Sequence, residues 1–325
     1  MSRRRVSVGA PIEPPDTWAP ASGTRQRFNR RRFLGYGLGG TAVVVAAGAT
    51  ALELVAHGVL PGQLELDELD GACSVPTAVL KFASPGPSLS GVFHSRTRNR
   101  NVGYTITYPP GHGPGDALPL VVMLHGEGGD HVNPLAGMTS ALAMALVVDG
   151  KPLPPMAMVT VDGGRGYWNP HPGDDPMGMV IDELIPMCQK RSLGVERIGA
   201  MGISMGGYGA VLLGEKYPHL INAVAAISPA IWTSYDQARN VNPGAYASAE
   251  DFAADDAVTH AGSLAGVPVR VASGISDPFQ PGVRALADHL PPGSVVVFSE
   301  GCHTGPFFTE QEPPSLVFLG EHLAN

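Results

Sequence analysis

Eight short apolar runs recur along the C-terminal three quarters of the chain, and they limit its fold more than any other feature. Several are continuously hydrophobic and rich in β-branched residues, which is typical of strands buried on both faces of a parallel sheet. Longer stretches with helical patterning lie between them. The runs cover residues 89–94, 104–108, 120–124, 156–161, 197–203, 223–227, 267–272 and 295–298.

Helices are expected at residues 135–148, 177–189, 208–216 and 283–290. Strands alternating with helices predict an α/β fold with a mostly parallel central sheet, and the first two runs favour an antiparallel start. Since 44% of the 325 residues are hydrophobic and 15% are charged, the chain can bury a sizeable core. Ligands of such sheets bind beyond the carboxyl ends of the strands, so the loops that follow the strands should carry the chemistry.

The N-terminal residues have the form of an export address. Asn29-Arg30-Arg31-Arg32-Phe33-Leu34 resembles a twin-arginine signal, and the run from Phe33 to Leu52 carries no charge. As a helix of ~1.5 Å per residue, this run is long enough to cross a bilayer. Small residues at 47–51 offer a cleavage site, so removal of the segment and retention as a membrane anchor both stay open. We divide the chain into a basic segment 1–34, an apolar signal or anchor 35–55, a linker 56–87 and a folded domain 88–325.

Charge is distributed unevenly along the chain. Residues 1–34 hold eight Arg against two acidic residues, a net +6, so the remaining part of the −8 chain carries −14. A domain this acidic is a poor binder of nucleic acid, because such binding depends on contacts between cations and phosphates. The positive-inside rule places the residues after 55 outside the cytoplasm, in the extracellular space or the cell envelope, with membrane contact through the apolar segment if it is retained.

A candidate nucleophile lies in Gly202-Ile203-Ser204-Met205-Gly206, which matches the Gly-x-Ser-x-Gly elbow. The motif alone is weak evidence in a chain with 42 Gly, but here a predicted strand precedes it and a predicted helix follows. Glycine at both flanks suits a sharp turn that leaves no space for a Cβ atom. Ser204 is therefore the expected nucleophile.

His303 and Asp277 complete a predicted catalytic triad. Each follows a predicted strand, and the chain order Ser, Asp, His is that of α/β hydrolases. The competing acids and bases lie in loops or helix-like stretches and fit less well; they are Asp255, Asp256, Asp288, His260 and His289.

Acyl transfer also needs donors for the developing oxyanion. The residue after the nucleophile, Met205, should supply one backbone N–H. The other is assigned to Glu127, in the Gly-rich loop after the run 120–124. We place His125 of the same loop on the substrate side, as an orienting or structural group rather than a base.

With these motifs the chain resembles the esterase D family of α/β hydrolases, which includes S-formylglutathione hydrolases and the secreted mycolyltransferases of the antigen 85 type. The matching segments are 124–126, 161–168, 182–186, 202–209 and 301–303. The resemblance implies an α/β-hydrolase fold without a large separate cap domain, and it implies that Tyr167 and Trp168 border the active site. The mycolyltransferases differ at the oxyanion loop and use Glu where this chain has Asp277, so the esterase-like members match better.

Two further groups leave alternatives open. The long connection 228–266 contains Trp232, which we expect at the substrate site, together with Tyr235, Tyr246 and Phe252; these aromatics could line an acyl or sugar site or pack a small lid. The cluster of His171, Asp174 and Asp175 reads as a solvated turn rather than a metal site.

The three cysteines, Cys73, Cys188 and Cys302, predict one disulfide and one free thiol in an exported domain, without indicating which pair forms. The expected function is that of an exported serine esterase or acyltransferase without a cofactor or metal. It would act on a small-molecule or lipid ester, with water or a glycan hydroxyl as acceptor. The alternative is a catalytically silent binding protein of the cell envelope that keeps the hydrolase scaffold.

Overall fold

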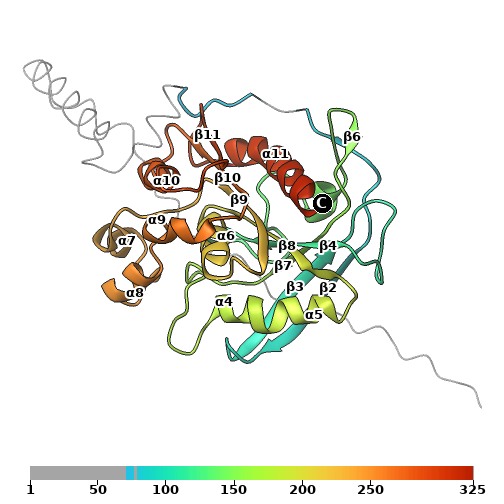
Figure 1. The fold of residues 1–325 in the computed structure, drawn as a ribbon, viewed down its shortest axis with the longest axis horizontal. Coiled ribbons are helices and arrows are strands. Elements are labelled where there is room, and N and C mark those ends of the chain that lie inside the picture. The colour runs from blue at the N-terminus through green and yellow to red at the C-terminus, as the bar shows by residue number, and fades with distance from the viewer. Residues whose placement is uncertain (1–70, 77–78, 325) are drawn as a thin grey trace, which may run out of the picture. The chain divides into compact units, whose positions relative to one another are not determined.

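A sheet of eight strands forms the centre of the computed structural model, which describes residues 71–76 and 79–324 (Figure 1). The strand order is β11-β10-β9-β8-β4-β7-β3-β2. The strands are β2 (Ser88–Ser95), β3 (Arg100–Thr107), β4 (Pro119–Leu124), β7 (Ala157–Val161), β8 (Gly194–Ile203), β9 (Ile221–Ile227), β10 (Val269–Gly274) and β11 (Val295–Ser299). Each of the eight predicted runs corresponds to one of them.

Six neighbouring strands of the sheet are parallel, from β7 through β4, β8, β9 and β10 to β11. The two remaining strands are antiparallel, β3 to β7 and β2 to β3. The antiparallel start and the mostly parallel sheet are therefore as predicted.

Side chains of the central strands alternate between two buried layers. Along β4, Leu120 and Val122 belong to one hydrophobic cluster, whereas Val121 and Met123 belong to the other. The first cluster includes side chains of α4 (Pro176–Met179), α5 (Ile185–Gln189), α6 (Met205–Lys216) and α10 (Gln280–Ala287); the second includes those of α3 (Ser140–Met144) and α11 (Gly305–Leu323). Because both faces are covered by helices, the central strands have no polar face, which explains their continuous hydrophobicity.

The helix expected at 135–148 is wrong in extent. Only α3 is helical there, starting at the Thr139 cap, and Leu146–Val148 forms β5 instead. Asp149 and Gly150 both have positive φ and connect β5 to β6 (Lys151–Pro152) in a tight hairpin. An Asp-Gly pair is a strong hairpin signal, and it overrides the helical pattern before it.

The other predicted helices exist with shifted limits. A π-helical turn, Val180–Leu184, joins α4 to α5, so residues 176–189 form one helical segment. Helix α11 was not predicted, because Pro313 and Pro314 lie inside it and proline normally ends a helix. Its buried face, with Phe307, Leu316 and Leu319 in the second cluster, outweighs that local preference.

Short helices make up most of the connection 228–266. They are α7 (Tyr235–Val241), α8 (Ala249–Ala254), α9 (Ala257–His260) and a 3₁₀ turn, Ala261–Leu264.

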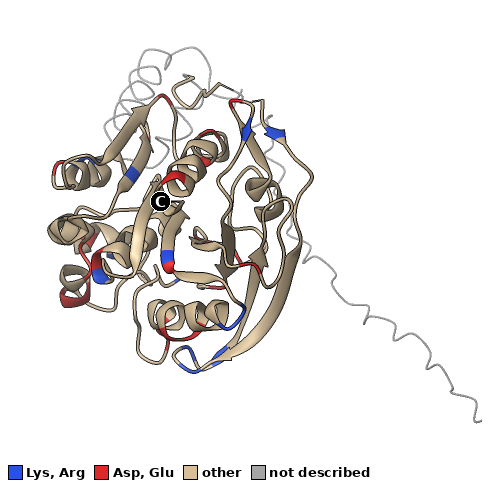
Figure 2. Ribbon diagram, turned by 45° about the vertical axis from the view of Figure 1, so that its right-hand side comes forward, with Lys and Arg blue, Asp and Glu red and all other residues tan. Residues whose placement is uncertain are grey.

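The predicted linker 56–87 is attached to the folded domain within its described part. Strand β1 (Lys81–Phe82) pairs with β5, and Cys73 forms a disulfide with Cys302. The twin-arginine segment and the apolar run 35–55 lie outside the described residues. Within the part that the structure describes, no helix has the length and apolarity needed to span a bilayer. Lys and Arg residues there are scattered over the elements rather than gathered on one surface (Figure 2).

A buried carboxyl group in α6 makes stability depend on pH. Glu215 is 6% exposed, and neither of its carboxyl oxygens has a hydrogen-bond partner. Burial, followed by the nearby carboxylates of Asp256 and Asp255, raises the pKa of Glu215 to about 9. Between the ordinary pKa and this value the native state keeps a proton that the unfolded state releases, so stability falls as pH rises through the window.

We therefore expect Glu215→Gln to raise the free energy of unfolding more at pH 9 than at pH 5, by at least ~1 kcal/mol. Urea unfolding of both proteins at pH 5, 7 and 9 measures the difference. Glu196→Gln, at an exposed position of β8, is the matched control and should show no such trend. Parallel pH curves for Glu215→Gln and wild type would contradict the prediction.

Candidate active site

Ser204 lies on a sharp turn between β8 and α6. Its backbone is left-handed, with φ 57° and ψ −120°, a conformation that L-residues rarely adopt. The neighbouring glycines are required by close packing: a Cβ on Gly202 would lie 2.0 Å from the carbonyl oxygen of Gly206, and one on Gly206 would lie 1.9 Å from that of Leu124. The turn therefore presents the Ser204 side chain beyond the carboxyl end of the sheet, as the elbow motif predicts.

The three predicted triad residues form one chain of hydrogen bonds. The Nδ1 atom of His303 lies 2.9 Å from Asp277 Oδ2, and its Nε2 atom lies 2.8 Å from Ser204 Oγ. Since a carboxylate only accepts, Nδ1–H donates to Asp277 and Nε2 is left to accept the Ser204 hydroxyl proton. This tautomer is the one that a general base acting on Ser204 needs.

Packing holds both His303 and Asp277 in place. The Asp277 side chain is fully buried, and its Oδ1 accepts a 2.8 Å hydrogen bond from the Phe279 backbone N–H. The rings of Phe279 and Phe308 both pack against the His303 ring, each with its centroid 5.0 Å away. With both ring nitrogens engaged and two aromatic rings packed against it, the imidazole has one well-defined orientation.

Both predicted oxyanion donors lie near Ser204. Met205 is the first residue of α6, where backbone N–H groups have no partner within the helix. Glu127 lines the same cavity as Ser204, and a Cβ on the preceding Gly126 would lie 3.6 Å from that of Ser204. The assignment of these two amides to the oxyanion stays a prediction.

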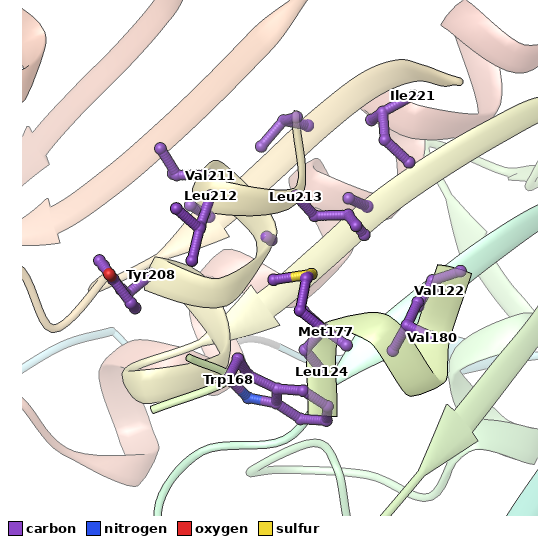
Figure 3. Close-up of a cluster of buried hydrophobic side chains, with 14 of the residues drawn as sticks. Val122, Leu124, Trp168, Met177, Val180, Tyr208, Val211, Leu212, Leu213 and Ile221 are labelled. Carbon is purple, nitrogen blue, oxygen red and sulfur yellow. The ribbon is translucent and has the colours of Figure 1, made fainter. Parts of the chain in front are cut away.

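His125 and Trp168 lie beneath the site rather than in it. Nδ1–H of His125 donates to the Gly126 carbonyl, and its Nε2 accepts from the Gly163 backbone N–H at 2.9 Å. Burial lowers the pKa of His125, in keeping with this neutral form. Trp168 donates to the His125 carbonyl and belongs to the buried cluster of Leu124 and Met177 (Figure 3). Neither lines the cavity, which corrects their expected place at the substrate site. His125 has instead the structural role that was its other expected reading, and both residues support the loop of Gly126 and Glu127.

A cavity of about 460 Å³ opens at Ser204 and His303. Tyr167 and Trp232, both expected at the substrate site, line it with Phe279 and Phe308. Tyr167 and Trp168 both have positive φ within a turn closed by a hydrogen bond from Asn169 N–H to the Gly166 carbonyl. Consecutive left-handed residues direct the Tyr167 ring to the cavity and the Trp168 ring to the core.

The aromatic residues of the connection 228–266 were expected either to line the substrate site or to pack a small lid, and the structure shows both arrangements. Trp232 lines the cavity, whereas Tyr246 and Phe252 pack edge to face at 5.1 Å, with Tyr235 6.4 Å from Phe252. Val241 and Asn242, at the end of α7, also line the cavity. The connection thus forms one wall of the cavity and a small aromatic core behind it.

Glu312 of α11 supports another wall and was missed because α11 was not predicted. Its Oε1 accepts a 2.7 Å hydrogen bond from the Ala136 backbone N–H, and Ala136 lines the cavity. Burial raises the pKa of Glu312 to about 7, against the opposing effect of this backbone bond.

The competing residues take other roles. Asp255 pairs with Lys216, and Asp256 caps α9. In the proposed turn, Asp174 pairs with the buried Arg98, and Asp175 caps α4. Among the described residues, no cluster of three or more His, Cys, Asp or Glu side chains could hold a metal ion.

Comparison with known proteins agrees with this architecture. The model of the family described as "Putative esterase" matches residues 95–281. A ferulic acid esterase aligns with a TM-score of 0.61 and 19% identity over 72% of this chain and 98% of its own. An S-formylglutathione hydrolase from Agrobacterium tumefaciens aligns at 0.58 and 17% over 77% and 100%, and a fluorophosphonate-binding serine hydrolase of Staphylococcus aureus at 0.57 and 14% over 72% and 98%. No curated protein sequence matches the chain. At these identities the solved structures share the fold.

The close packing at the elbow predicts the effect of one added methyl group. Gly206→Ala should destabilise the protein by ~3 kcal/mol or more, because the new Cβ would overlap the Leu124 backbone. Gly262→Ala is the matched control, since nothing lies within 4 Å of its added Cβ, and it should change stability by less than ~0.5 kcal/mol. Thermal unfolding of both variants measures the difference. Equal stability would show that β4 and α6 are not packed as described.

Proposed function

Because the chain belongs to the esterase family matched over residues 95–281, we propose that it is a serine esterase acting through an acyl-enzyme on Ser204. The observation that carries the proposal is the continuous hydrogen-bonded chain from Ser204 through His303 to the buried Asp277. Such a chain activates a hydroxyl that would otherwise be a weak nucleophile.

The proposed reaction has two steps. Ser204 Oγ attacks the ester carbonyl while His303 Nε2 takes the hydroxyl proton, and the same proton then passes to the leaving alcohol as the C–O bond breaks. Water repeats the sequence on the acyl-enzyme, which releases the carboxylic acid and regenerates Ser204. Asp277 keeps the imidazole oriented and stabilises its charged form, and the Met205 and Glu127 N–H groups would bind the oxyanion.

The cavity supports a small-molecule or lipid ester as substrate, because aromatic side chains line the space next to Ser204. We also propose that the protein is exported by the twin-arginine route and acts in the cell envelope or outside the cell. The Cys73–Cys302 disulfide supports this location, since disulfides persist in oxidising compartments.

Removing the nucleophile should abolish turnover. We expect Ser204→Ala to lower kcat for p-nitrophenyl esters by roughly 10³- to 10⁶-fold and Asp277→Asn by about 10⁴-fold. In parallel, intact mass after exposure to a fluorophosphonate should show one adduct on wild type and none on Ser204→Ala. Ser263→Ala, at an exposed site, is the control and should retain both properties.

The catalytically silent binding protein makes the opposite prediction. In that case folded wild type would form no adduct and hydrolyse no ester, although it could still bind glycolipid. Near-wild-type turnover by Ser204→Ala would instead exclude Ser204 as the nucleophile.

The acceptor of the acyl group distinguishes a hydrolase from an acyltransferase. We expect water to be the main acceptor, because the oxyanion loop and Asp277 match the esterase-like members of the family better than the mycolyltransferases. Mass spectrometry of the products formed with and without a sugar would then show the free acid as the dominant product in both. A dominant acylated sugar would identify a transferase and leave the triad chemistry unchanged.

A further inference from the structure

A disulfide joins the N-terminal segment of the described chain to the residue that precedes His303. Cys302 is completely buried, whereas its partner Cys73 is half-buried. Cys302 belongs to a five-residue loop between the end of β11 at Ser299 and the start of α11 at Gly305. The disulfide therefore constrains the backbone of the residue next to His303, within this short loop.

The same loop is packed against the loop that carries Asp277. The Gly301 carbonyl accepts a 3.0 Å hydrogen bond from the Ser276 backbone N–H. A Cβ on Gly274 would lie 2.2 Å from that carbonyl oxygen, so the two loops are in backbone contact. A shift of residues 301–302 would therefore disturb both His303 and Asp277.

The N-terminal segment also contacts this loop. A Cβ on Gly301 would lie 3.2 Å from the Val75 side chain, and Val75 packs with the second hydrophobic cluster. Gly301 itself has φ 137°, a conformation that resists any other residue. The His303 loop thus contacts both the Asp277 loop and residues 73–75, and the disulfide links it covalently to the latter.

We propose that the Cys73–Cys302 disulfide is a positioning element of the active site, which keeps His303 Nε2 within hydrogen-bond reach of Ser204 Oγ. The inference rests on the proposed function and adds that the esterase activity belongs to the oxidised form. A displacement of about 1 Å in a catalytic group can lower a rate by roughly 10²-fold, so a small relaxation of the loop is sufficient.

Reduction tests the role of the bond without changing a residue. Dithiothreitol passes two electrons and two protons to the disulfide, which becomes two thiols, while the reductant closes to its own cyclic disulfide. Reduction of the full chain below its unfolding temperature should lower kcat for a p-nitrophenyl ester by roughly 10²-fold, with KM changed less than about twofold. Reoxidation with oxidised glutathione should restore kcat.

Variants separate the disulfide from other thiol chemistry. Cys73→Ser removes the disulfide by changing the cysteine that is far from His303 in sequence. Its kcat should be as low as that of the reduced wild type, whether or not reductant is present. Cys188→Ala, which removes the free buried cysteine, should keep wild-type activity and the sensitivity to reductant. A crystal structure of Cys73→Ser should show the distance from Ser204 Oγ to His303 Nε2 increased beyond ~3.5 Å.

Two results would overturn the proposal. In the first, reduced protein and Cys73→Ser stay folded by circular dichroism with unchanged kcat and an unchanged Ser204–His303 distance. In the second, reduction unfolds the whole domain together with the loss of activity, which would make the disulfide a general stabilising link. Failure of the proposed function looks different: oxidised wild type would then form no fluorophosphonate adduct, while the distance in the Cys73→Ser crystal would still report on the bridge.

Discussion

The contact of the Gly206 backbone with the carbonyl of Leu124 determines how closely α6 approaches β4, and the site depends on that approach. Because no Cβ intervenes, the helix can start directly after Ser204 and direct its first N–H groups toward the carboxyl edge of the sheet. The loop of Gly126 and Glu127 leaves β4 at the same point, immediately after Leu124. Ser204, the helix terminus and the loop therefore share one small region, and strain at Ser204 is balanced by the packing around it.

The sheet could be predicted from the sequence because burial on both faces leaves a strong signal in each strand. The triad could be predicted for a related reason: each member follows a strand, and strand ends meet at one edge of the sheet. The sequence does not show how side chains pack around the carboxyl ends of the strands. His125 and Trp168 look like pocket residues beside Ser204 and Tyr167, yet their hydrogen bonds and burial place them one layer below.

Helix α11 was missed because its local sequence pattern predicts a helix end rather than a continuous helix. Pro313 and Pro314 predict a helix end inside α11, and only the packing of its buried face against the sheet reverses that preference. The role of Glu312 was not predicted because helix α11, which contains it, was not predicted. The cysteine pairing stayed open for another reason. It depends on the path of the N-terminal segment over the domain, and the pattern of residue types in the sequence does not indicate that path.

The disulfide also determines how the domain would respond to a pulling force. Cys73 and Cys302 are separated by 229 positions in sequence, so every strand of the eight-stranded sheet lies within the covalent ring that they close. Tension applied between the two ends of the chain would pass from Cys73 directly to Cys302 and along α11. Strands β2 to β11 would remain outside the loaded path, and traction on the N-terminus could not peel them apart while the bond is intact.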